Sequence, residues 1–250
     1  MKCGDERMII TFLGVGEAFG RFANTSILVD GGILLDCGPH TLLQLRKHEQ
    51  DLKEIKLVFL SHFHGDHTLG LPALLLASRE EDREEKLKIF GPSGLREKIA
   101  DLLELSYEKS FEDLNFELET IEIPDLNGCT KYGDYELEFA QTAHSIECYS
   151  VAISNSKTGK KLTYTSDGAP TDDTVSIARN SDILIAEAYG EEFSGHSSAV
   201  KAAELAFRSH SKSLALVHIY RNKKAKEELE KARKIFKNSF LPTDSLTVTI

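Results

Sequence analysis

The sequence of 250 residues has no tryptophan and only four cysteines, Cys3, Cys37, Cys129 and Cys148. The cysteines form no CxxC pair and are too few for a disulfide framework in a chain of this length. We therefore expect reduced and mostly buried thiols. No apolar run approaches the roughly 18 residues of a membrane-spanning helix. These absences exclude a disulfide-stabilised scaffold and predict no membrane span.

Basic residues are also fewer than acidic residues. The formal net charge is −10, because 40 Asp and Glu residues outnumber 30 Lys and Arg residues. Broad, non-specific nucleic-acid binding depends on basic surface, so this balance argues against it while leaving room for a local basic patch. The first residues, MKCGDERMIITF, carry acids where a secretory signal needs a basic start and a long apolar stretch. We therefore expect a cytoplasmic protein.

Short β-branched apolar runs recur along the chain and predict strands. They are MIITFL, SILVD, ILLD, KLVFLS, KIF, YELEFAQT, YSVAIS, KLTYTS, DILIAEA, SLALVHI and SLTVTI. Helical patterns lie between some of them, at 41–48, 95–109, 197–210 and 223–237. No repeat and no Pro/Gly/Ser linker interrupts this order. The sequence therefore predicts one α/β domain over residues 1–250, with large sheets covered by helices.

Two further stretches invite a functional interpretation that their context does not support. LGVGEAFG (13–20) has glycines spaced like a dinucleotide fingerprint, but two strand-like runs follow it instead of the helix that would hold a pyrophosphate. We interpret it as a turn. The charge run SREEDREEKLK (78–88) predicts a solvated loop or helix end.

Three histidines and an aspartate crowd into SHFHGDH, residues 61–67, directly after the apolar run IKLVFL. In a tight loop after a strand, His62 and His64 can converge on one cation. Asp66 and His67 can then face a second cation. Imidazole and carboxylate ligands suit zinc, manganese or iron, whereas calcium and magnesium prefer sites built from oxygen. The cluster therefore predicts half of a two-metal site.

The remaining ligands must come from elsewhere in the chain. His144, Asp167 and His218 each follow the end of an apolar run, which is where α/β sheets place their sites. Taken singly, each could equally be a loop cap or a hydrogen-bonded core residue, but the cluster favours ligation. We assign His62, His64 and His144 to one metal and Asp66, His67 and His218 to the other, with Asp167 bridging them.

Two cations a few ångströms apart lower the pKa of a shared water toward neutrality and take up charge that develops in the transition state. The predicted reaction is therefore hydrolysis. No thiolate belongs to the predicted ligand set, so the residues imply no redox role. Zinc is the metal that we expect first, and the same ligands accept manganese or iron.

The pattern HxHxDH at 62–67 resembles the signature of the metallo-β-lactamase superfamily, and the downstream His, Asp and His follow in the family's order. The resemblance covers nearly the whole chain. It implies a four-layer αββα sandwich with the metals at one edge of two facing sheets. It implies attack by a metal-bridging hydroxide, with Asp66 among the catalytic residues. It also implies that Asp36, in LLDCG, lies behind the ligands and orients them.

Within the superfamily, the chain most resembles the ribonuclease Z-like branch. SHFHGDHTLGLPALL, IFGPSG and LLDCGPHTLLQL are similar to motifs of that branch, and ILIAEAY and GHSSAVKAAELA are similar to its HEAT and HST segments. In the branch, the acid of HEAT orients the histidine of HST, which protonates the leaving oxygen. Glu187 and His196 match these positions, so the resemblance implies phosphodiester cleavage with His196 as general acid. Without this resemblance, we would interpret His196 as a residue that flanks the start of a helix.

Departures from the branch bear on the substrate. The HEAT histidine is Ala186 here. The members that process tRNA carry a long exosite arm between the third histidine motif and the bridging aspartate, whereas only 22 residues separate His144 from Asp167 and they read as a hairpin. The stretch VGEAFGRFAN (15–24) also lacks the cysteines of the extra zinc site in cyclic phosphodiesterases of phosphonate breakdown. We therefore expect a small phosphodiester or a short RNA as substrate.

Other interpretations stay open. The same scaffold hydrolyses thioesters, lactones or sulfate esters in branches that share the ligands, and Glu187 and His196 are the residues that distinguish phosphodiester cleavage. A tRNA 3′ processing endoribonuclease is a further alternative. A non-catalytic metal-binding or nucleic-acid-binding module is disfavoured by the complete ligand set. The resemblance also implies a homodimer as one expected assembly. Residues 74–82 or the helix at 41–48 would contribute to its interface.

Overall fold

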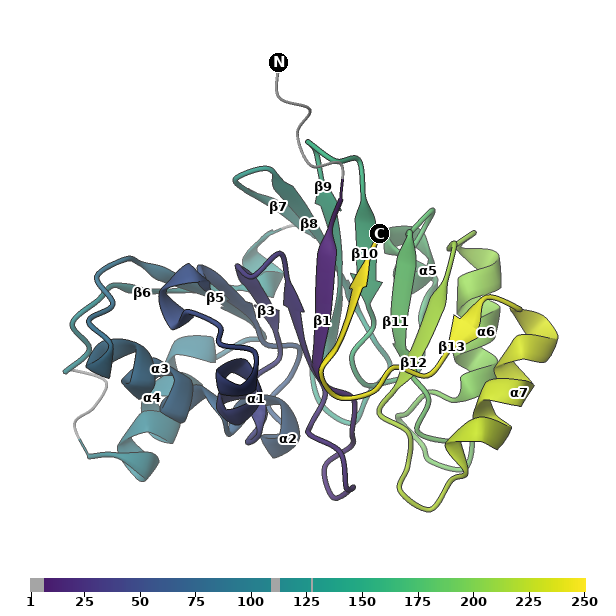
Figure 1. Cartoon of the computed structure of the whole chain (residues 1–250), viewed down its shortest axis with the longest axis horizontal. Coiled ribbons are helices and arrows are strands. Elements are labelled where there is room, and N and C mark those ends of the chain that lie inside the picture. The colour runs from purple at the N-terminus through teal and green to yellow at the C-terminus, as the bar shows by residue number, and fades with distance from the viewer. Residues whose placement is uncertain (1–6, 109–112, 127) are drawn as a thin grey trace.

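Two facing β-sheets form the middle of the molecule, and helices cover both outer faces (Figure 1). The computed structural model describes residues 7–108, 113–126 and 128–250. Within these residues the two sheets have seven strands each. This arrangement confirms the four-layer αββα sandwich.

In the first sheet, the C-terminal strand lies beside the N-terminal one. Its strands are, in spatial order, β14 (Leu246–Thr249), β1 (Ile9–Gly14), β2 (Ser26–Val29), β3 (Ile33–Leu35), β4 (Leu57–Phe59), β5 (Leu87–Gly91) and β6 (Leu118–Glu122). Neighbours from β14 to β3 run antiparallel, and neighbours from β3 to β6 run parallel.

The second sheet has the same division into a parallel and an antiparallel half. Its strands are, in spatial order, β13 (Ser239–Phe240), β12 (Leu214–Val217), β11 (Ile183–Glu187), β10 (Lys161–Tyr164), β9 (Tyr149–Asn155), β8 (Tyr135–Gln141) and β7 (Cys129–Tyr132). Neighbours from β13 to β10 run parallel, and neighbours from β10 to β7 run antiparallel. The carboxyl ends of parallel strands meet at one edge of a sheet, where sites of α/β proteins form.

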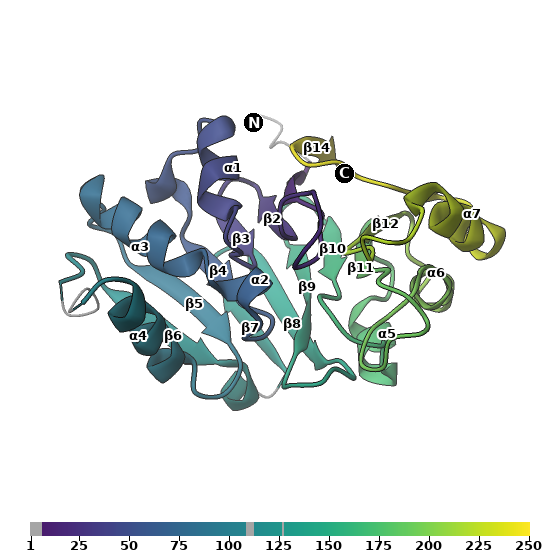
Figure 2. The same ribbon diagram turned by 90° about the horizontal axis from the view of Figure 1, so that it is seen from below.

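The helices divide between the two outer faces by chain order (Figure 2). The first sheet is covered by α1 (Thr41–Lys47), α2 (Gly65–Thr68), α3 (Leu71–Glu80) and α4 (Leu95–Ser106), and the second by α5 (Asp172–Ile177), α6 (Ala199–Arg208) and α7 (Ala225–Ile235). Short 3₁₀ helices occupy Leu52–Glu54 and Ile123–Leu126. The four predicted helical patterns correspond to α1, α4, α6 and α7, although residue 109 of the second lies outside the described residues.

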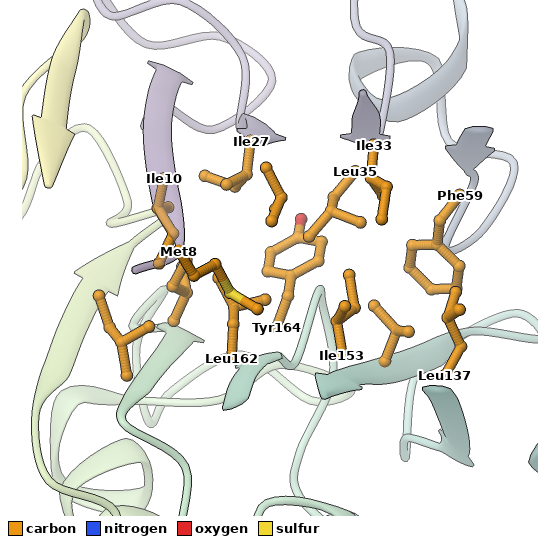
Figure 3. Close-up of a cluster of buried hydrophobic side chains, with 14 of the residues drawn as sticks. Met8, Ile10, Ile27, Ile33, Leu35, Phe59, Leu137, Ile153, Leu162 and Tyr164 are labelled. Atoms are coloured by element: carbon orange, nitrogen blue, oxygen red, sulfur yellow. The ribbon is translucent and has the colours of Figure 1, made fainter. Parts of the chain in front are cut away.

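Three large apolar clusters hold the four layers together. The largest lies between the sheets and includes Ile10, Phe59 and Tyr164 (Figure 3). A second joins the first sheet to α1, α3 and α4, and a third joins the other sheet to α5, α6 and α7. Both faces of the central strands are buried, which explains why they read as continuous apolar runs instead of alternating ones.

The expectation of buried, free thiols is met at two of the three cysteines that the structure describes. Cys37 and Cys148 are buried and free, whereas Cys129 is exposed, and Cys3 lies outside the described residues. Among the described helices, none is both long and apolar enough to cross a membrane. The cytoplasmic location stays a prediction.

Arg83 departs from the solvated charge run expected at 78–88, because its side chain is fully buried. The guanidinium donates hydrogen bonds to the carbonyl oxygens of Leu52 (2.9 Å) and Ile55 (2.7 Å), and to two carbonyls of the turn that follows it. Phe116 lies with its ring centroid 5.3 Å from the guanidinium carbon. Arg83 therefore links backbone carbonyl groups of two separate segments, of which the Leu52 carbonyl also accepts a bond from Ile55 N.

We expect Arg83→Met to lower the free energy of unfolding by about 3 kcal/mol, since it removes four hydrogen bonds to backbone carbonyl groups, two of them buried. Urea unfolding followed by circular dichroism measures the change. Arg79→Ala is the matched control: its guanidinium, on the surface of α3, pairs with the adjacent Glu80, and its loss should change stability by no more than about 0.5 kcal/mol. Equal effects of the two substitutions would contradict this role for Arg83.

Candidate metal centre

The predicted ligands come together at the edge where the parallel strands of both sheets end. His62 and His64 follow β4, and Asp66 and His67 lie in the short helix α2. From the second sheet, His144, Asp167 and His218 follow β8, β10 and β12. All seven residues predicted from the sequence therefore belong to one site. Their binding of metal stays a prediction.

One group is formed by three imidazoles and one carboxylate. His64 Nδ1 lies 3.1 Å from His62 Nε2 and 3.2 Å from His144 Nε2, and Asp167 is near enough to share an ion with them. The opposite ring nitrogens are already held: His62 Nδ1 by the Ser61 hydroxyl at 2.9 Å and His144 Nδ1 by the carbonyl of residue 195 at 2.5 Å. These bonds leave the converging nitrogens free to act as ligands of one ion.

The second group is formed by Asp66, His67 and His218. The Asp66 carboxylate lies 3.1 Å from His218 Nε2 and 3.4 Å from His67 Nε2. Asp167 directs one oxygen to each group: its Oδ1 lies 3.5 Å from His67 Nε2, and its Oδ2 lies 3.9 Å from His62 Nε2. The geometry thus allows the division made in the sequence analysis, with Asp167 between the two groups, and Asp167 and His218 also converge with Glu187 as a third candidate group.

Asp36 lies behind these ligands and is fully buried. Its carboxylate accepts hydrogen bonds from Ser61 N (2.8 Å), from the Ser61 hydroxyl (2.9 Å), from the Tyr164 hydroxyl (2.8 Å) and from His67 Nδ1 (2.7 Å). Figure 3 shows Tyr164 reaching from the second sheet toward the first. Because Asp36 fixes the proton of His67 on Nδ1, the lone pair of His67 Nε2 is directed into the site.

The backbone at the site is folded more tightly than most residues allow. Asp36, Ser166 and His218 have positive φ angles of 59°, 55° and 53°. A Cβ atom at Gly38 would lie 2.1 Å from the carbonyl oxygen of Asp66, so only glycine permits this approach. Such conformations cost about 1–3 kcal/mol each and persist where the surrounding structure enforces them.

Carboxylates dominate the charge of the site. Burial raises the pKa of Asp167 to about 6, in spite of the nearby histidines. Burial would lower the pKa of His218, but Asp167 and Asp66 outweigh it and raise that pKa to about 10. Burial and the neighbouring imidazoles lower the pKa of His62, which keeps this ring neutral. The second group therefore attracts positive charge, and the first offers neutral imidazole ligands.

Polar atoms without partners show that the residues fit metal ions. Few buried side-chain nitrogen and oxygen atoms of the described residues lack a hydrogen bond. Three of them lie here: His67 Nε2, Asp167 Oδ1 and His218 Nδ1. Buried polar groups are almost always paired, so such a concentration needs a partner that is not a protein atom. A divalent cation meets this need because it binds neutral imidazole and carboxylate together.

We expect Asp36→Asn to weaken zinc binding by about 10- to 100-fold, because the amide no longer fixes the proton of His67 on Nδ1. Competition with a chromophoric chelator measures this affinity. Asp182→Asn is the matched control, since Asp182 is also mostly buried and accepts bonds from Lys161 N and the Lys212 ammonium group, but it precedes β11 at the far edge of the sheet. An unchanged affinity in Asp36→Asn would contradict this role.

His196 and Glu187 form a pair beside the two groups. Glu187 ends β11 and is buried, and its Oε1 lies 2.5 Å from His196 Nδ1. Its Oε2 accepts from Gly168 N (2.9 Å) and Ser197 N (2.7 Å). Burial alone would lower the pKa of His196, but the hydrogen bond and charge of Glu187 raise it. The pair that the resemblance suggested is therefore assembled, with His196 Nε2 left unused by Glu187.

A cavity of about 300 Å³ opens onto these residues, and its lining includes His64, Asp66, Asp167, His196 and His218. Two aromatic residues that the sequence analysis did not select, Phe19 and Tyr189, also line it. Phe19 lies in the stretch interpreted as a turn, and Tyr189 lies two residues beyond the end of β11. No local pattern distinguishes them, because it is the meeting of two distant loops that brings them to the cavity.

Comparisons with known proteins agree with this geometry. The model of the family described as anti-Pycsar protein Apyc1 matches residues 8–239. A ribonuclease Z of Picrophilus torridus is 30% identical over 96% of this chain and 95% of its own length. A ribonuclease Z of Saccharolobus solfataricus is 30% identical over 87% of this chain and 89% of its own length.

Solved structures with the same fold include YhfI of Bacillus subtilis, a metallo-β-lactamase fold protein, with a TM-score of 0.83 and 20% identity over 98% of this chain and all of that one. The short form of human tRNase Z, ELAC1, has a TM-score of 0.78 and 24% identity over 96% of this chain and 98% of that one. At these identities the likeness establishes the fold.

Proposed function

This chain belongs to the family of the anti-Pycsar protein Apyc1, in the ribonuclease Z-like branch of the metallo-β-lactamase superfamily, and we propose that it is a phosphodiesterase for a small phosphodiester or a short RNA. It is a metal-dependent hydrolase. The observation that carries the phosphodiester assignment is the Glu187–His196 pair, which faces the same cavity as the two ligand groups.

In this proposal, the ligand groups would hold two divalent cations, zinc first with manganese or iron as alternatives. His62, His64 and His144 would hold one, Asp66, His67 and His218 would hold the other, and Asp167 would contribute to both. When bound, the cations supply an activated water and neutralise charge that develops on the phosphoryl oxygens. The chain's own residues keep the imidazole lone pairs directed inward through Asp36 and Ser61.

His196 acts as the general acid. Glu187 holds His196 Nδ1, so the proton that can be delivered to substrate is the one on Nε2. Two backbone amides fix Glu187 in turn, and the ring of Tyr189 stacks on His196 with centroids 4.3 Å apart. A leaving alkoxide needs a proton as its bond to phosphorus breaks, and a histidine restrained on both sides is suited to supply it.

The dimensions and charge of the cavity favour a short substrate. The volume of about 300 Å³ suits a small molecule, and among its lining residues, all of them described, none is lysine or arginine. A long RNA needs many cationic contacts to phosphates. Residues 145–166 contain only a loop and the hairpin β9–β10, so no additional arm projects between His144 and Asp167.

A ribonuclease acting on longer RNA is the second candidate, because the curated relatives are named ribonuclease Z. Hydrolysis of a thioester, lactone or sulfate ester is the third. Both alternatives use the same ligands, so substrate tests distinguish them. A single domain over residues 1–250, the homodimer and the cytoplasmic location stay predictions, of which the first is supported by the continuous core between the sheets.

The test begins with the metal content of the purified protein, for which we expect two ions per chain. Turnover of bis(p-nitrophenyl) phosphate, a precursor tRNA, a thioester, a lactone and a sulfate ester is then compared at equal metal loading. Hydrolysis of the diester with little or none of the other substrates supports the proposal. Two metals with turnover confined to thioesters, lactones or sulfates would overturn it, and efficient cleavage of the precursor tRNA would favour the second candidate.

A further inference from the structure

Phe19 is an aromatic residue that lines the cavity while it remains 77% exposed. It lies in the loop between β1 and β2 and lines the cavity together with residues of the metal centre. A single exposed apolar residue is ordinary on a protein surface and carries no meaning by itself. The contacts that hold this one distinguish it.

A buried carboxylate fixes the backbone at Phe19. Glu17 is 1% exposed, and its Oε2 accepts a hydrogen bond from Phe19 N at 2.9 Å. The same carboxylate pairs with the guanidinium of Arg221, whose Nη1 lies 3.2 Å from each of its oxygens. Arg221 follows His218 and β12 in the chain, so this ion pair joins the Phe19 loop to the loop that carries a predicted metal ligand.

The guanidinium also supports the ring of Phe19. Its central carbon lies 5.4 Å from the centroid of the Phe19 ring and 4.8 Å from that of Tyr220. A guanidinium over an aromatic face is attracted by the ring quadrupole. Phe19 is therefore held through its backbone and its ring, although most of its surface contacts no protein atom.

A second group of aromatic rings adjoins the same cavity through Tyr189. Tyr189 stacks on His196 with an interplanar angle of 22° and contacts Phe193 and Tyr220, with ring centroids 4.8 and 5.2 Å away. The predicted general acid therefore adjoins an aromatic surface, and Phe19 faces the cavity from another loop. Aromatic rings at a binding site offer large, rigid contact area at low conformational entropy cost.

We propose that Phe19 is a recognition residue that stacks against a planar ring of the substrate, and that this ring is a nucleobase attached to the scissile phosphodiester. Glu17 and Arg221 act as positioning residues for Phe19. The inference deepens the proposed phosphodiesterase function and rests on it for the bond that is broken. Stacking accepts any base, because every base has a π face, and it does not require the basic groove that this cavity lacks.

The test compares two ligands that differ only in the base. Adenosine 5′-monophosphate and ribose 5-phosphate are titrated calorimetrically into the zinc-loaded chain. We expect the nucleotide to bind about 5- to 150-fold more tightly, the range that one base stacked on one aromatic residue gives. Phe19→Ala should remove this difference and Phe19→Tyr should preserve it. Phe207→Ala, which removes an equally apolar ring that is 65% exposed on α6, should leave it unchanged.

Fluorescence distinguishes stacking from mere proximity. The 5′-monophosphate of 2-aminopurine riboside is quenched when its base stacks, and the chain has no tryptophan to interfere. We expect quenching with wild type and Phe19→Tyr, but not with Phe19→Ala. Equal binding of the two ligands by wild type overturns the inference, and so does a preference for the nucleotide that survives Phe19→Ala.

Kinetics with a nucleoside p-nitrophenyl phosphate test the positioning role. Arg221→Met should raise KM several-fold with little change in kcat, and Arg221→Lys should recover part of the loss because lysine still pairs with Glu17. A fall confined to kcat would overturn this role. If wild type hydrolyses no phosphodiester, the proposed function fails, and the binding measurements still decide the role of Phe19 because they need no turnover.

Discussion

Replacing His196 with alanine should lower kcat for an unactivated phosphodiester by about 10²–10⁴-fold, the contribution of a positioned general acid. The physical reason is that an alkoxide is a poor leaving group unless it is protonated as the bond to phosphorus breaks. His196 can supply that proton because Glu187 holds its Nδ1 at 2.5 Å. Steady-state kinetics on a dinucleotide, whose leaving group is an unactivated 3′ or 5′ alkoxide, measure the loss.

The same variant should behave differently toward an activated substrate. p-Nitrophenolate leaves without protonation, so His196→Ala should lower turnover of bis(p-nitrophenyl) phosphate far less than turnover of the dinucleotide. His210→Asn, an exposed histidine just beyond the other end of α6, serves as the control and should affect neither. An equal loss on both substrates would show that His196 shapes the site without donating a proton.

The second large effect expected is the stabilisation of the fold by metal. Ligands that bind only the folded chain stabilise it by about 4 kcal/mol at a free concentration near 1,000 times Kd, which for a chain of this length raises Tm by roughly 10 °C. Chelation should therefore lower Tm by a comparable amount. Differential scanning calorimetry of zinc-loaded and chelator-treated protein measures the difference.

Asp167→Asn separates metal binding from packing. Asp167 lies between the two groups, so its loss should reduce the metal content below two ions per chain and remove most of the response to chelator. In the metal-free state, however, the variant should be at least as stable as wild type. The reason is that it removes a buried carboxylate from a site that already contains Asp36, Asp66 and Glu187. A variant with full metal content would show that Asp167 does not bridge.

Much of the site could be predicted from sequence because of where polar residues fall. The segment 61–67 places four candidate ligands within seven positions, and its spacing alone indicates a metal site. His144, Asp167 and His218 each end an apolar run. Asp167 and His218 follow strands of the parallel half, whose carboxyl ends meet at one edge of the sheet, and the structure places them there. His144 reaches the same edge from β8, which pairs antiparallel with its neighbours, so this part of the site depends on the tertiary structure.

Other elements escaped prediction for identifiable reasons. Helix α3 was not predicted because its first residues belong to the motif SHFHGDHTLGLPALL, which was interpreted as a ligand segment. Its last residues belong to the charge run at 78–88, which was interpreted as solvated. Strand β6 was not predicted because its residues are only half-buried at the sheet margin, which weakens the apolar signal. Arg83 looks like a surface residue in sequence, and only its distant partners Leu52 and Ile55 make its burial favourable.

The sequence by itself determined the α/β class and predicted the candidate ligands and their division into two groups, because strand periodicity and ligand spacing are local properties. Only the tertiary structure decided which groups hold the second ring nitrogen of His62, His67 and His144, Asp36 among them, and which residues line the cavity. Those features join positions such as Glu17 and Arg221 that are far apart in the chain. Their contacts depend on how two sheets pack face to face, and no local pattern encodes that packing.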